Sequence, residues 1–174
     1  EDQPMSSFWS DASLEPKRKY RFTVNINNDP TYVVTKVKNP AVKISETPHK
    51  FLNHTFYYPG RAEWDPIDIS FVDTTDRLYN KLLKSGYEQP DALNGGVFGF
   101  TKNAATSVGV GNVKINQLGV KGKLGTELRT VAYWELTNAF FTNISWGDYD
   151  YNGEEMLECS VTIRYDFADF INLQ

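Results

Sequence analysis

The sequence contains very few of the residues that cross-link a chain, ligate a metal or cross a membrane. Its 174 residues include one cysteine, Cys159, and two histidines, His49 and His54. A single cysteine forms no internal disulfide, so we expect a buried thiol in a protein synthesised in a reducing cytoplasm. No run of 18 apolar residues and no apolar leader segment occurs, which predicts a soluble protein without membrane binding of its own.

Clustered positive charge is also scarce. The net charge is −4, and residues 127–174 hold two cations, Arg129 and Arg164, against nine acids, a net charge of −7. The remainder is net +3, with its Lys and Arg residues scattered. Tight binding to a nucleic-acid duplex needs clustered cations that neutralise phosphates, so this composition argues against a nucleic-acid-binding protein.

Catalytic and metal-binding motifs are incomplete. The run DYDYNG, from Asp148 to Gly153, matches the first six positions of a calcium loop, but the twelfth position is Cys159 instead of glutamate. His49 and His54 are five residues apart, a spacing that places them on opposite faces of one strand, and they lack the further ligands of a zinc site. We therefore predict no enzyme activity, no cofactor and no metal.

What the sequence does have is alternation of apolar and polar residues, which is the pattern of a strand with one dry and one wet face. Near the C-terminus the apolar parity consists of Leu157, Cys159, Val161, Ile163, Tyr165 and Phe167. A preceding strand is predicted from apolar residues of one parity, with polar Asn138 and Thr142 between them: Trp134, Leu136, Phe140, Ile144 and Trp146. Turn-forming residues from Asp150 to Gly153 join the two strands, so we expect an antiparallel hairpin, extended backwards by residues 126–133.

The other regular patterns complete a mainly β fold. KYRFTVNI, closed by a turn at NNDP, and WDPIDISFVD also alternate, while Leu78, Tyr79, Leu82 and Leu83 are spaced for one short helix ending at Gly86. We predict an N-terminal arm over 1–16 and a single β domain over 17–174. Residues 87–126 form a long glycine-rich excursion, in which a strand is expected near 113–118. The expected architecture is a two-sheet sandwich or partial barrel.

Two apolar segments do not fit an ordinary core. Residues 47–59, TPHKFLNHTFYYP, are aromatic but lack a clean parity, so their large side chains cannot all point into one core. Residues 1–16 are polar except for one aromatic pair that gains nothing in a free tail. We therefore predict that both segments contact another chain through Phe8, Trp9, Phe51, Leu52, Phe56, Tyr57 and Tyr58.

Four runs of the sequence resemble tail tube proteins of contractile-tailed bacteriophages. They are KYRFTVNI, YYPGRAEWDPIDISFVD, NAFFTNISWGDYDYNGEE and SVTIRYD, in that order along the chain. That family is similar in fold to the haemolysin-coregulated protein of type VI secretion. The resemblance implies homohexameric rings in which each sheet joins a shared β-barrel. It also implies a segment near residues 47–59 that contacts the adjacent ring.

The same resemblance implies a function and a set of partners. The rings would stack into the inner tube of a contractile tail, inside a sheath and on a baseplate, as part of a virion. DNA would pass through the tube during genome ejection without adhering to its wall. Together with strand parity, the family fold suggests Glu158, Ser160, Thr162 and Arg164 as lumen-facing candidates, on a net acidic wall that repels phosphate.

Three questions stay open: the type of assembly, the face that lines the lumen, and the class of protein. Baseplate tube initiators, and the tubes of type VI and extracellular injection systems, are similar in fold to phage tube subunits. Parity alone does not distinguish a lumen face from an outer face. A β-sandwich ligand-binding module is the alternative of a different class, since aromatic residues make up 14% of the chain.

Overall fold

The computed structural model describes residues 17–27, 29–31, 33–74, 102, 110–121 and 127–173. The predicted helix, the N-terminal arm over 1–16 and most of the glycine-rich excursion lie outside these residues. Within the described residues, no helix is long and apolar enough to cross a membrane. The elements are β1 (Phe22–Ile26), β2 (Asp29–Thr31), β3 (Val34–Val37), β4 (Val42–Phe51), β5 (His54–Trp64), β6 (Ile67–Val72), β7 (Gly111–Lys121), β8 (Glu127–Trp146), β9 (Glu158–Arg164) and β10 (Phe167–Asn172).

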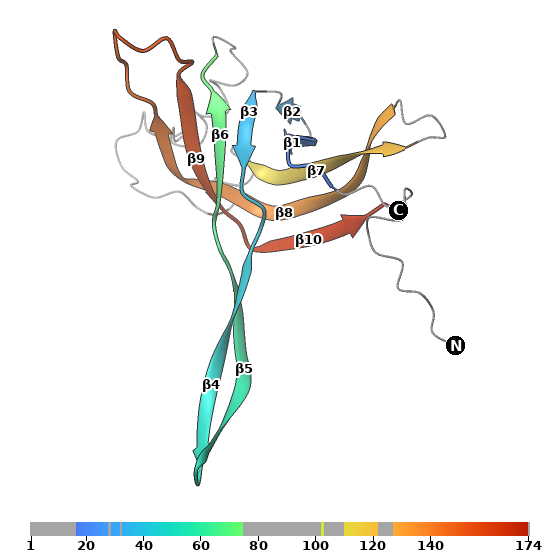
Figure 1. Cartoon of the computed structure of the whole chain (residues 1–174), viewed down its shortest axis with the longest axis vertical. Helices are drawn as coiled ribbons and strands as arrows, with labels where there is room; N and C mark the ends of the chain where they lie inside the picture. Colours follow the sequence, from blue (N-terminus) through green and yellow to red (C-terminus); the bar gives the residue numbers. More distant parts are fainter. Residues whose placement is uncertain are drawn as a thin grey trace, which may run out of the picture.

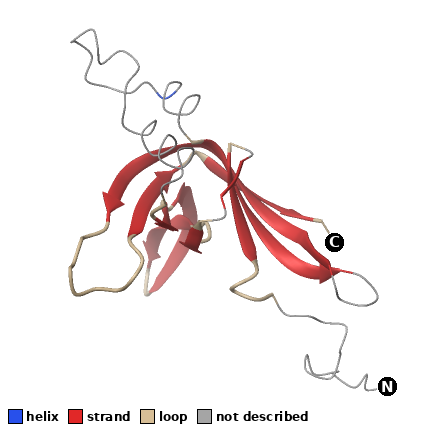
Figure 2. Ribbon diagram, turned by 90° about the horizontal axis from the view of Figure 1, so that it is seen from above, coloured by secondary structure: helices blue, strands red, loops and turns tan. Residues whose placement is uncertain are grey.

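The strands form one strongly bent sheet and a separate two-stranded ribbon (Figure 1). The order in the bent sheet is β2-β1-β7-β8-β9-β6-β3, and β10 pairs with β8. The first part of β8 pairs with β7 and β10, and its last part pairs with β9. The sheet therefore folds about β8 into two layers, as seen from above in Figure 2. The predicted mainly β, two-sheet architecture is confirmed.

The core fills the space between the two layers. Every second residue of β6 and β9 is buried, including Ile67, Ile69, Val161 and Ile163. The opposite layer contributes apolar residues of β1, β7 and β8 to the same cluster. The alternating strands predicted around KYRFTVNI, WDPIDISFVD and residues 157–167 are thus confirmed as β1, β6 and β9, and the strand expected near 113–118 is confirmed as part of β7. Cys159 is buried in this cluster, as predicted.

The bend lies at Asn138, which adopts a left-handed conformation with φ of 56°. Gly111, which pairs with Ala139, has φ of 58° on the neighbouring strand. Left-handed backbone suits glycine and, among other residues, asparagine, which is why these two types stand at the bend. The irregularity changes which residues face inward, because Leu136 and Ala139 are both buried although their parities differ.

Two orientation predictions fail at this bend and at the end of β9. Phe140 does not join the core: it pairs with the exposed Arg164, while Phe141 packs inward. Phe167 is 56% exposed, since the chain starts a new strand after Arg164 and its neighbour Ala168 is buried instead. Trp146 lies on the dry side as predicted, opposite the buried Cys159, but it is exposed because it stands at the open end of β8.

Candidate assembly interfaces

The most prominent feature of the molecule is a long ribbon formed by β4 and β5 (Figure 1). We call this ribbon the arm; it is distinct from the N-terminal arm predicted over 1–16. The two strands pair antiparallel with each other only, from Val42 opposite Trp64 to Phe51 opposite His54. Leu52, at the tip, has φ of 53° and is 88% exposed. Every residue of β4 is exposed. The arm is a two-stranded ribbon without a core of its own.

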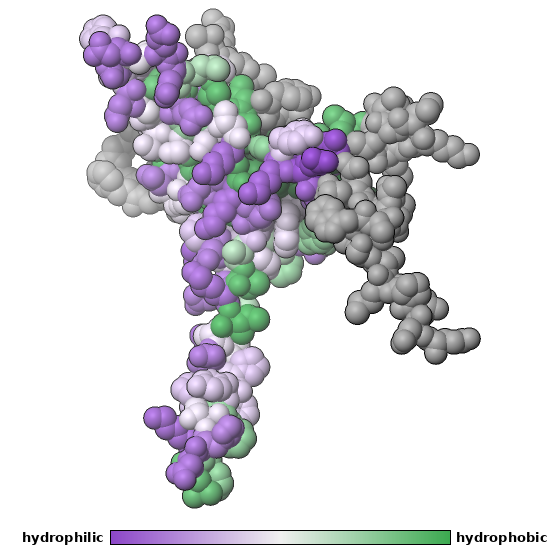
Figure 3. All heavy atoms as spheres, viewed as in Figure 1, coloured by the Kyte–Doolittle hydropathy of each residue, from purple (hydrophilic) through white to green (hydrophobic). Residues whose placement is uncertain are grey.

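The arm carries the predicted interface residues in its stem and tip. Phe51, Leu52, Phe56, Tyr57 and Tyr58 are all exposed, and hydrophobic side chains stand uncovered along the arm in Figure 3. The cross-strand register places aromatic rings on both faces of the ribbon, because Phe56 pairs with His49 and Tyr57 pairs with Pro48. Phe8 and Trp9 lie outside the described residues, so their contact stays a prediction.

The prediction that His49 and His54 lie on opposite faces of one strand is wrong. The turn at Leu52 falls between them, so they stand on neighbouring strands and on the same face of the ribbon. The His54 ring lies 4.6 Å from the Phe56 ring, edge to face. Among the described residues, no group of three or more potential metal ligands is found.

The base of the arm is fixed to the body. The Trp64 ring lies 5.7 Å from the Phe167 ring and 6.0 Å from the Tyr165 ring, and the Asp65 amide donates to the Ala41 carbonyl at 2.9 Å. Lys43 pairs with Asp65 at 3.0 Å. The direction of the arm is therefore set at its root, while its stem makes no described contact with the body.

Glu158, Ser160, Thr162 and Arg164 all point to the solvent side of β9. Cys159, Val161 and Ile163 between them are buried, so the parity argument is correct. Thr162 Oγ1 donates to Asp68 Oδ1 at 2.8 Å, and Thr142 Oγ1 donates to the Thr162 carbonyl at 3.2 Å. The result is a wet face of hydroxyl groups linked across β8, β9 and β6.

The charge of this face is balanced. Register places Asp68 of β6 and Lys36 of β3 on the same side as the four β9 residues. Glu158 and Asp68 thus offset Arg164 and Lys36. The face is polar and close to neutral, whereas the sequence predicted an acidic one, because Lys36 is distant in sequence and only the fold brings it there.

A second wet face covers the other layer. Asn116 Nδ2 of β7 lies 3.2 Å from Thr23 Oγ1 and 3.3 Å from Asn25 Oδ1 of β1. Lys114 pairs with Glu135 of β8 at 3.3 Å, so the charges here are paired as well. The molecule therefore has two polar faces, and either could line a lumen. This agrees with the expectation that strand parity alone does not identify the lumen face.

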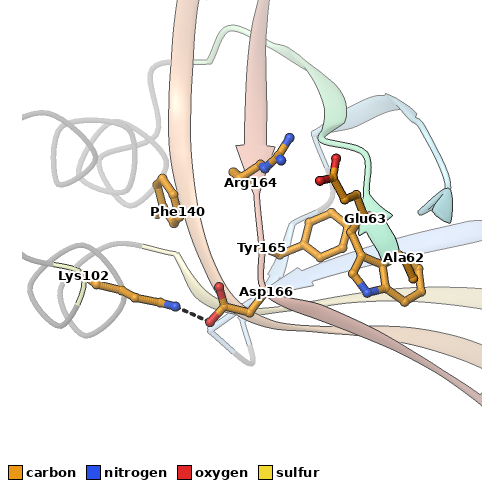
Figure 4. A pocket seen from close by; sticks show the side chains of 8 residues that line it. Ala62, Glu63, Lys102, Phe140, Arg164, Tyr165 and Asp166 are labelled. Carbon is orange, nitrogen blue, oxygen red and sulfur yellow. Dashed lines mark hydrogen bonds and ion pairs between the residues drawn. The ribbon is translucent and has the colours of Figure 1, made fainter. Parts of the chain in front are cut away.

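A cavity of about 630 Å³ lies where the arm joins the bend (Figure 4). Asp166 stands on its wall and accepts hydrogen bonds from Lys102 and, at 2.9 Å, from Asn138 Nδ2. The Lys102 bond, followed by the Asn138 bond, lowers the pKa of Asp166 from its ordinary value. The Asp166 amide also donates to the Thr137 carbonyl. These contacts tie the β9–β10 junction to the bend of β8.

Tyr165 forms the inner wall of the same cavity. Burial raises the pKa of its phenol, and the backbone of Ala41 acts against that shift. Its hydroxyl is buried without a hydrogen-bond partner of acceptable geometry among the described residues. The wall therefore combines hydrogen bonds that hold the bend with one buried hydroxyl that lacks a partner, and no histidine or cysteine is among its described residues.

A second cavity of about 480 Å³ opens between β3 and the layer formed by β1, β7, β8 and β10. Among the described residues, its lining includes no Asp or Glu and five Lys or Arg residues: Lys17, Arg18, Lys19, Arg21 and Lys36. Aromatic rings of Phe22, Tyr133, Trp134 and Phe170 line it as well. We call it the basic mouth. Sequence reasoning missed it, although four of its cations form the visible run KRKYR.

No protein-family model and no curated protein match the sequence. Solved structures do. A chain of the anti-feeding prophage cap, described as the tube terminating cap, superposes with a TM-score of 0.66 at 16% identity, covering 97% of this chain and 99% of that one. A chain of the sheath-tube complex of PVC, an extracellular contractile injection system, superposes with a TM-score of 0.60 at 16% identity, and the match covers 99% of this chain and 100% of that one. A chain of the anti-feeding prophage baseplate gives 0.63 at 16% identity, covering 92% and 98%.

The chain has the tube fold of contractile injection systems. These neighbours cover almost the whole chain, so the tube fold includes the arm and both layers of the body. All three neighbours are parts of multi-subunit assemblies that contain a tube, a sheath or a baseplate. At 16% identity the comparison establishes the fold, and the surfaces described above carry the functional argument.

Proposed function

We propose that this protein is a ring-forming subunit that stacks into the inner tube of a contractile tail. In this proposal six copies form a ring, each sheet joins a shared β-barrel, and the tube associates with a sheath and a baseplate. The observation that carries the proposal is the arm, with its exposed aromatic residues on both faces. The tube fold of its structural neighbours agrees with it.

The arm supports stacking because such a ribbon is not stable alone. An isolated two-stranded hairpin is at best marginally stable in water, and a third strand or a packed face is needed. Here Phe51, Phe56 and Tyr58 share one face with no described residue over them. Burying three such side chains would contribute several kcal/mol, at about 1.5–3 kcal/mol each. The adjacent ring is the surface that would cover them.

Ring closure follows from the edges of the sheet. Within the described residues β10 pairs with β8 alone, which leaves its other edge without a partner strand. Unpaired edges invite pairing with another chain, and closing a sheet into a barrel removes them. Exposed Phe167, Phe170 and Leu173 along β10 add apolar area to that edge. A contact of this kind between identical chains closes into a ring or extends as a filament.

The β9 face is the proposed lumen wall. Glu158, Ser160, Thr162 and Arg164 present hydroxyls and balanced charges, with no excess of Lys or Arg to retain phosphate by counterion release. A wall of this type would let a polyanion such as DNA pass without adhering. On this basis we place the subunit in a phage tail that ejects a genome.

The second candidate is the tube of an extracellular injection system. The printed descriptions of the neighbours name an anti-feeding prophage and an extracellular contractile injection system, which favours this alternative. The body, the arm and the ring would be the same, and the cargo would be a protein instead of DNA. A tube initiator at the baseplate would differ from both in being present in few copies per particle.

Electron microscopy of the purified protein tests the proposal. We expect hexameric rings, and hollow tubes at high concentration. Removing residues 1–14, which include Phe8 and Trp9, should shorten the tubes while leaving single rings. Uniform monomers at high concentration would contradict the proposal, and a tube map with the β9 hydroxyl face turned outward would remove the lumen assignment.

A further inference from the structure

Two described surfaces carry opposite charge, and the proposed function does not pair them with each other. One is the basic mouth, and the other is the loop between β8 and β9, residues 147–157, which we call the acidic loop. We propose that the acidic loop of one copy docks in the basic mouth of a second copy, in a head-to-tail contact. The inference rests on the proposed self-assembly and identifies one pair of surfaces that makes it.

The basic mouth is suited to an anionic and aromatic occupant. Four of its cations come from one short segment, Lys17 to Arg21, and no acid lines the cavity among the residues that the structure describes. The Trp134 and Phe170 rings lie 5.0 Å apart on its wall, and the Lys17 ammonium stands 5.1 Å from the centre of the Phe170 ring. Clustered cations around a partly apolar cavity raise the local potential, so an acidic ligand is attracted and like charges are excluded.

The acidic loop has the complementary properties. It holds four acids and no Lys or Arg, and all four are exposed: Asp148, Asp150, Glu154 and Glu155. Tyr149 is 90% exposed and Tyr151 is fully exposed, so two large rings stand in water without cover. Tyrosine is a residue that anchors protein interfaces through its ring and its hydroxyl. Tyrosines flanked by acids match aromatic rings flanked by Lys and Arg.

The acidic loop has a defined shape on a firm base. The Asn152 amide donates to Asp150 Oδ1 at 3.0 Å, and the Gly153 amide donates to the Asp150 carbonyl at 3.3 Å. At its root the Gly147 amide donates to the Glu158 carbonyl at 3.0 Å. A Cβ on Gly147 would lie 2.6 Å from that same carbonyl oxygen, so the close approach needs glycine. The loop is thus presented by two paired strands.

The loop and the mouth of one copy are directed apart. The mouth contacts β8 at Trp134, before the bend at Asn138, whereas the loop begins after Trp146. The eight residues from the bend to Trp146 span about 26 Å of extended strand. In Figure 1 the loop extends at the upper left, while β10, which contributes Phe170 to the mouth, runs to the right. A second copy is therefore the partner, and the contact is heterologous.

The chain offers one rival occupant. Residues 1–16 carry four acids and no Lys or Arg, together with Phe8 and Trp9, and they join the mouth directly at Lys17. A free anion such as phosphate is the other rival. We favour the acidic loop because its two rings are exposed and its base is fixed, which lowers the entropy lost on docking.

Exchange of charge between two variants tests the contact. The loop variant is Glu154→Lys with Glu155→Lys, and the mouth variant is Lys17→Glu with Lys19→Glu, which leaves the β9 face unchanged. By analytical ultracentrifugation at low salt, each alone should self-associate at least about tenfold more weakly than the unchanged protein. An equal mixture should recover to within about threefold, because each altered loop then meets an altered mouth and each unaltered loop meets an unaltered one.

Recovery in the mixture also shows that both variants are folded. Two further variants complete the test. Tyr149→Ser with Tyr151→Ser should weaken association without a change in charge. Glu158→Lys with Thr162→Lys adds three positive charges on the β9 face, one fewer than the loop variant adds to the acidic loop, and should leave association intact.

Three results would overturn the inference. The first is a loop variant that associates as strongly as the unchanged protein. The second is a mixture whose association does not recover. The third is that removal of residues 1–16 weakens association as much as the mouth variant does, while the loop variant does not weaken it. Added phosphate that strengthens association of both the unchanged protein and the loop variant, and has no effect on the mouth variant, would also overturn it, because a free anion would then be the occupant of the basic mouth. If the unchanged protein forms no rings at any concentration, the proposed function fails too, so the two failures are distinguishable.

Discussion

The body and the arm of this molecule are both built from β-strands, but their aromatic side chains differ in burial. In the body, Phe71 of β6 is fully buried between two layers, whereas Phe56 of the arm is 46% exposed on a ribbon that nothing described covers. Alternation of polar and apolar residues produces strands in both regions. What differs is whether the chain supplies a second layer. The core of the body is covered by the chain itself, whereas in the proposed tube the arm is covered by a neighbour.

The largest expected effect sets these two phenylalanines against each other. Phe71→Ala removes a fully buried ring and should lower the free energy of unfolding by about 3–5 kcal/mol. Phe56→Ala should change it by less than about 0.5 kcal/mol, because the ring is exposed in the isolated chain. Urea unfolding of the dilute protein measures both. Equal losses would mean that the arm is packed against its own body.

Self-association should show the reverse. Phe56→Ala combined with Leu52→Asn removes two arm residues that the account places against the next ring, and stacking should weaken about a hundredfold. Tube length and sedimentation report the change, with Leu128→Ala, at an exposed leucine of the body, as the control. Tubes of normal length from the arm variant would refute the stacking role.

Two glycines give a matched pair of smaller effects. A Cβ on Gly119 would lie 2.5 Å from Val131 Cγ1 in the body, and a Cβ on Gly60 would lie 2.2 Å from Ser45 Oγ in the arm. Gly119→Ala should cost the body about 1–3 kcal/mol by overpacking. Gly60→Ala should leave thermal unfolding almost unchanged while weakening assembly, and Ser45→Ala should partly restore it. A large loss of thermal stability from Gly60→Ala would contradict an independent arm.

The β9 face should affect transport and leave assembly unchanged. Glu158→Lys with Thr162→Lys makes the proposed lumen cationic, so DNA should be retained and its delivery slowed at low salt, with normal tubes in electron micrographs. Ejection kinetics at low and high salt measure this. Delivery at an unchanged rate in low salt would exclude an electrostatic role for that wall.

The smallest expected effect concerns the bend that joins the two regions. Hydrogen bonds from Lys102 and Asn138 lower the pKa of Asp166, so its contribution to stability is present above its ordinary pKa of 3.8 and is lost as the pH falls through the lowered value. Asp166→Asn should therefore flatten the acid limb of the stability curve slightly. The carboxylate is largely exposed, which keeps the effect small. The measurement is the free energy of unfolding as a function of pH for the unchanged protein and for Asp166→Asn. If the two curves coincide at acidic pH, the lowered pKa of Asp166 has no role in stability.

Much of the body was predictable because its strands keep a strict parity. Val24 and Ile26 of β1, and Cys159, Val161 and Ile163 of β9, are buried as their alternation indicates. The failures cluster where parity is interrupted. At Asn138 the left-handed residue and the shift that follows turn Phe140 outward, and after Arg164 a new strand exposes Phe167. Neither interruption is visible in an apolar pattern.

The candidate interfaces were predictable to different degrees. Phe51, Leu52, Phe56, Tyr57 and Tyr58 were identified because no single face could bury them, and the structure places all of them in solvent. The position of the turn was not predicted, so His49 and His54 were assigned to one strand. The basic mouth required tertiary structure, because Lys36 approaches the run from Lys17 to Arg21 only when β3 packs across from β1.

Hydrogen exchange of the backbone amides in β4 and β5 tests the central claim most directly, with dilute monomer compared with assembled protein. We expect rapid exchange of the arm amides in the monomer, strong protection of the same amides after assembly, and protected β6 and β9 amides in both states. Arm amides that are equally protected in the dilute monomer, or that stay unprotected in the assembled protein, would contradict it.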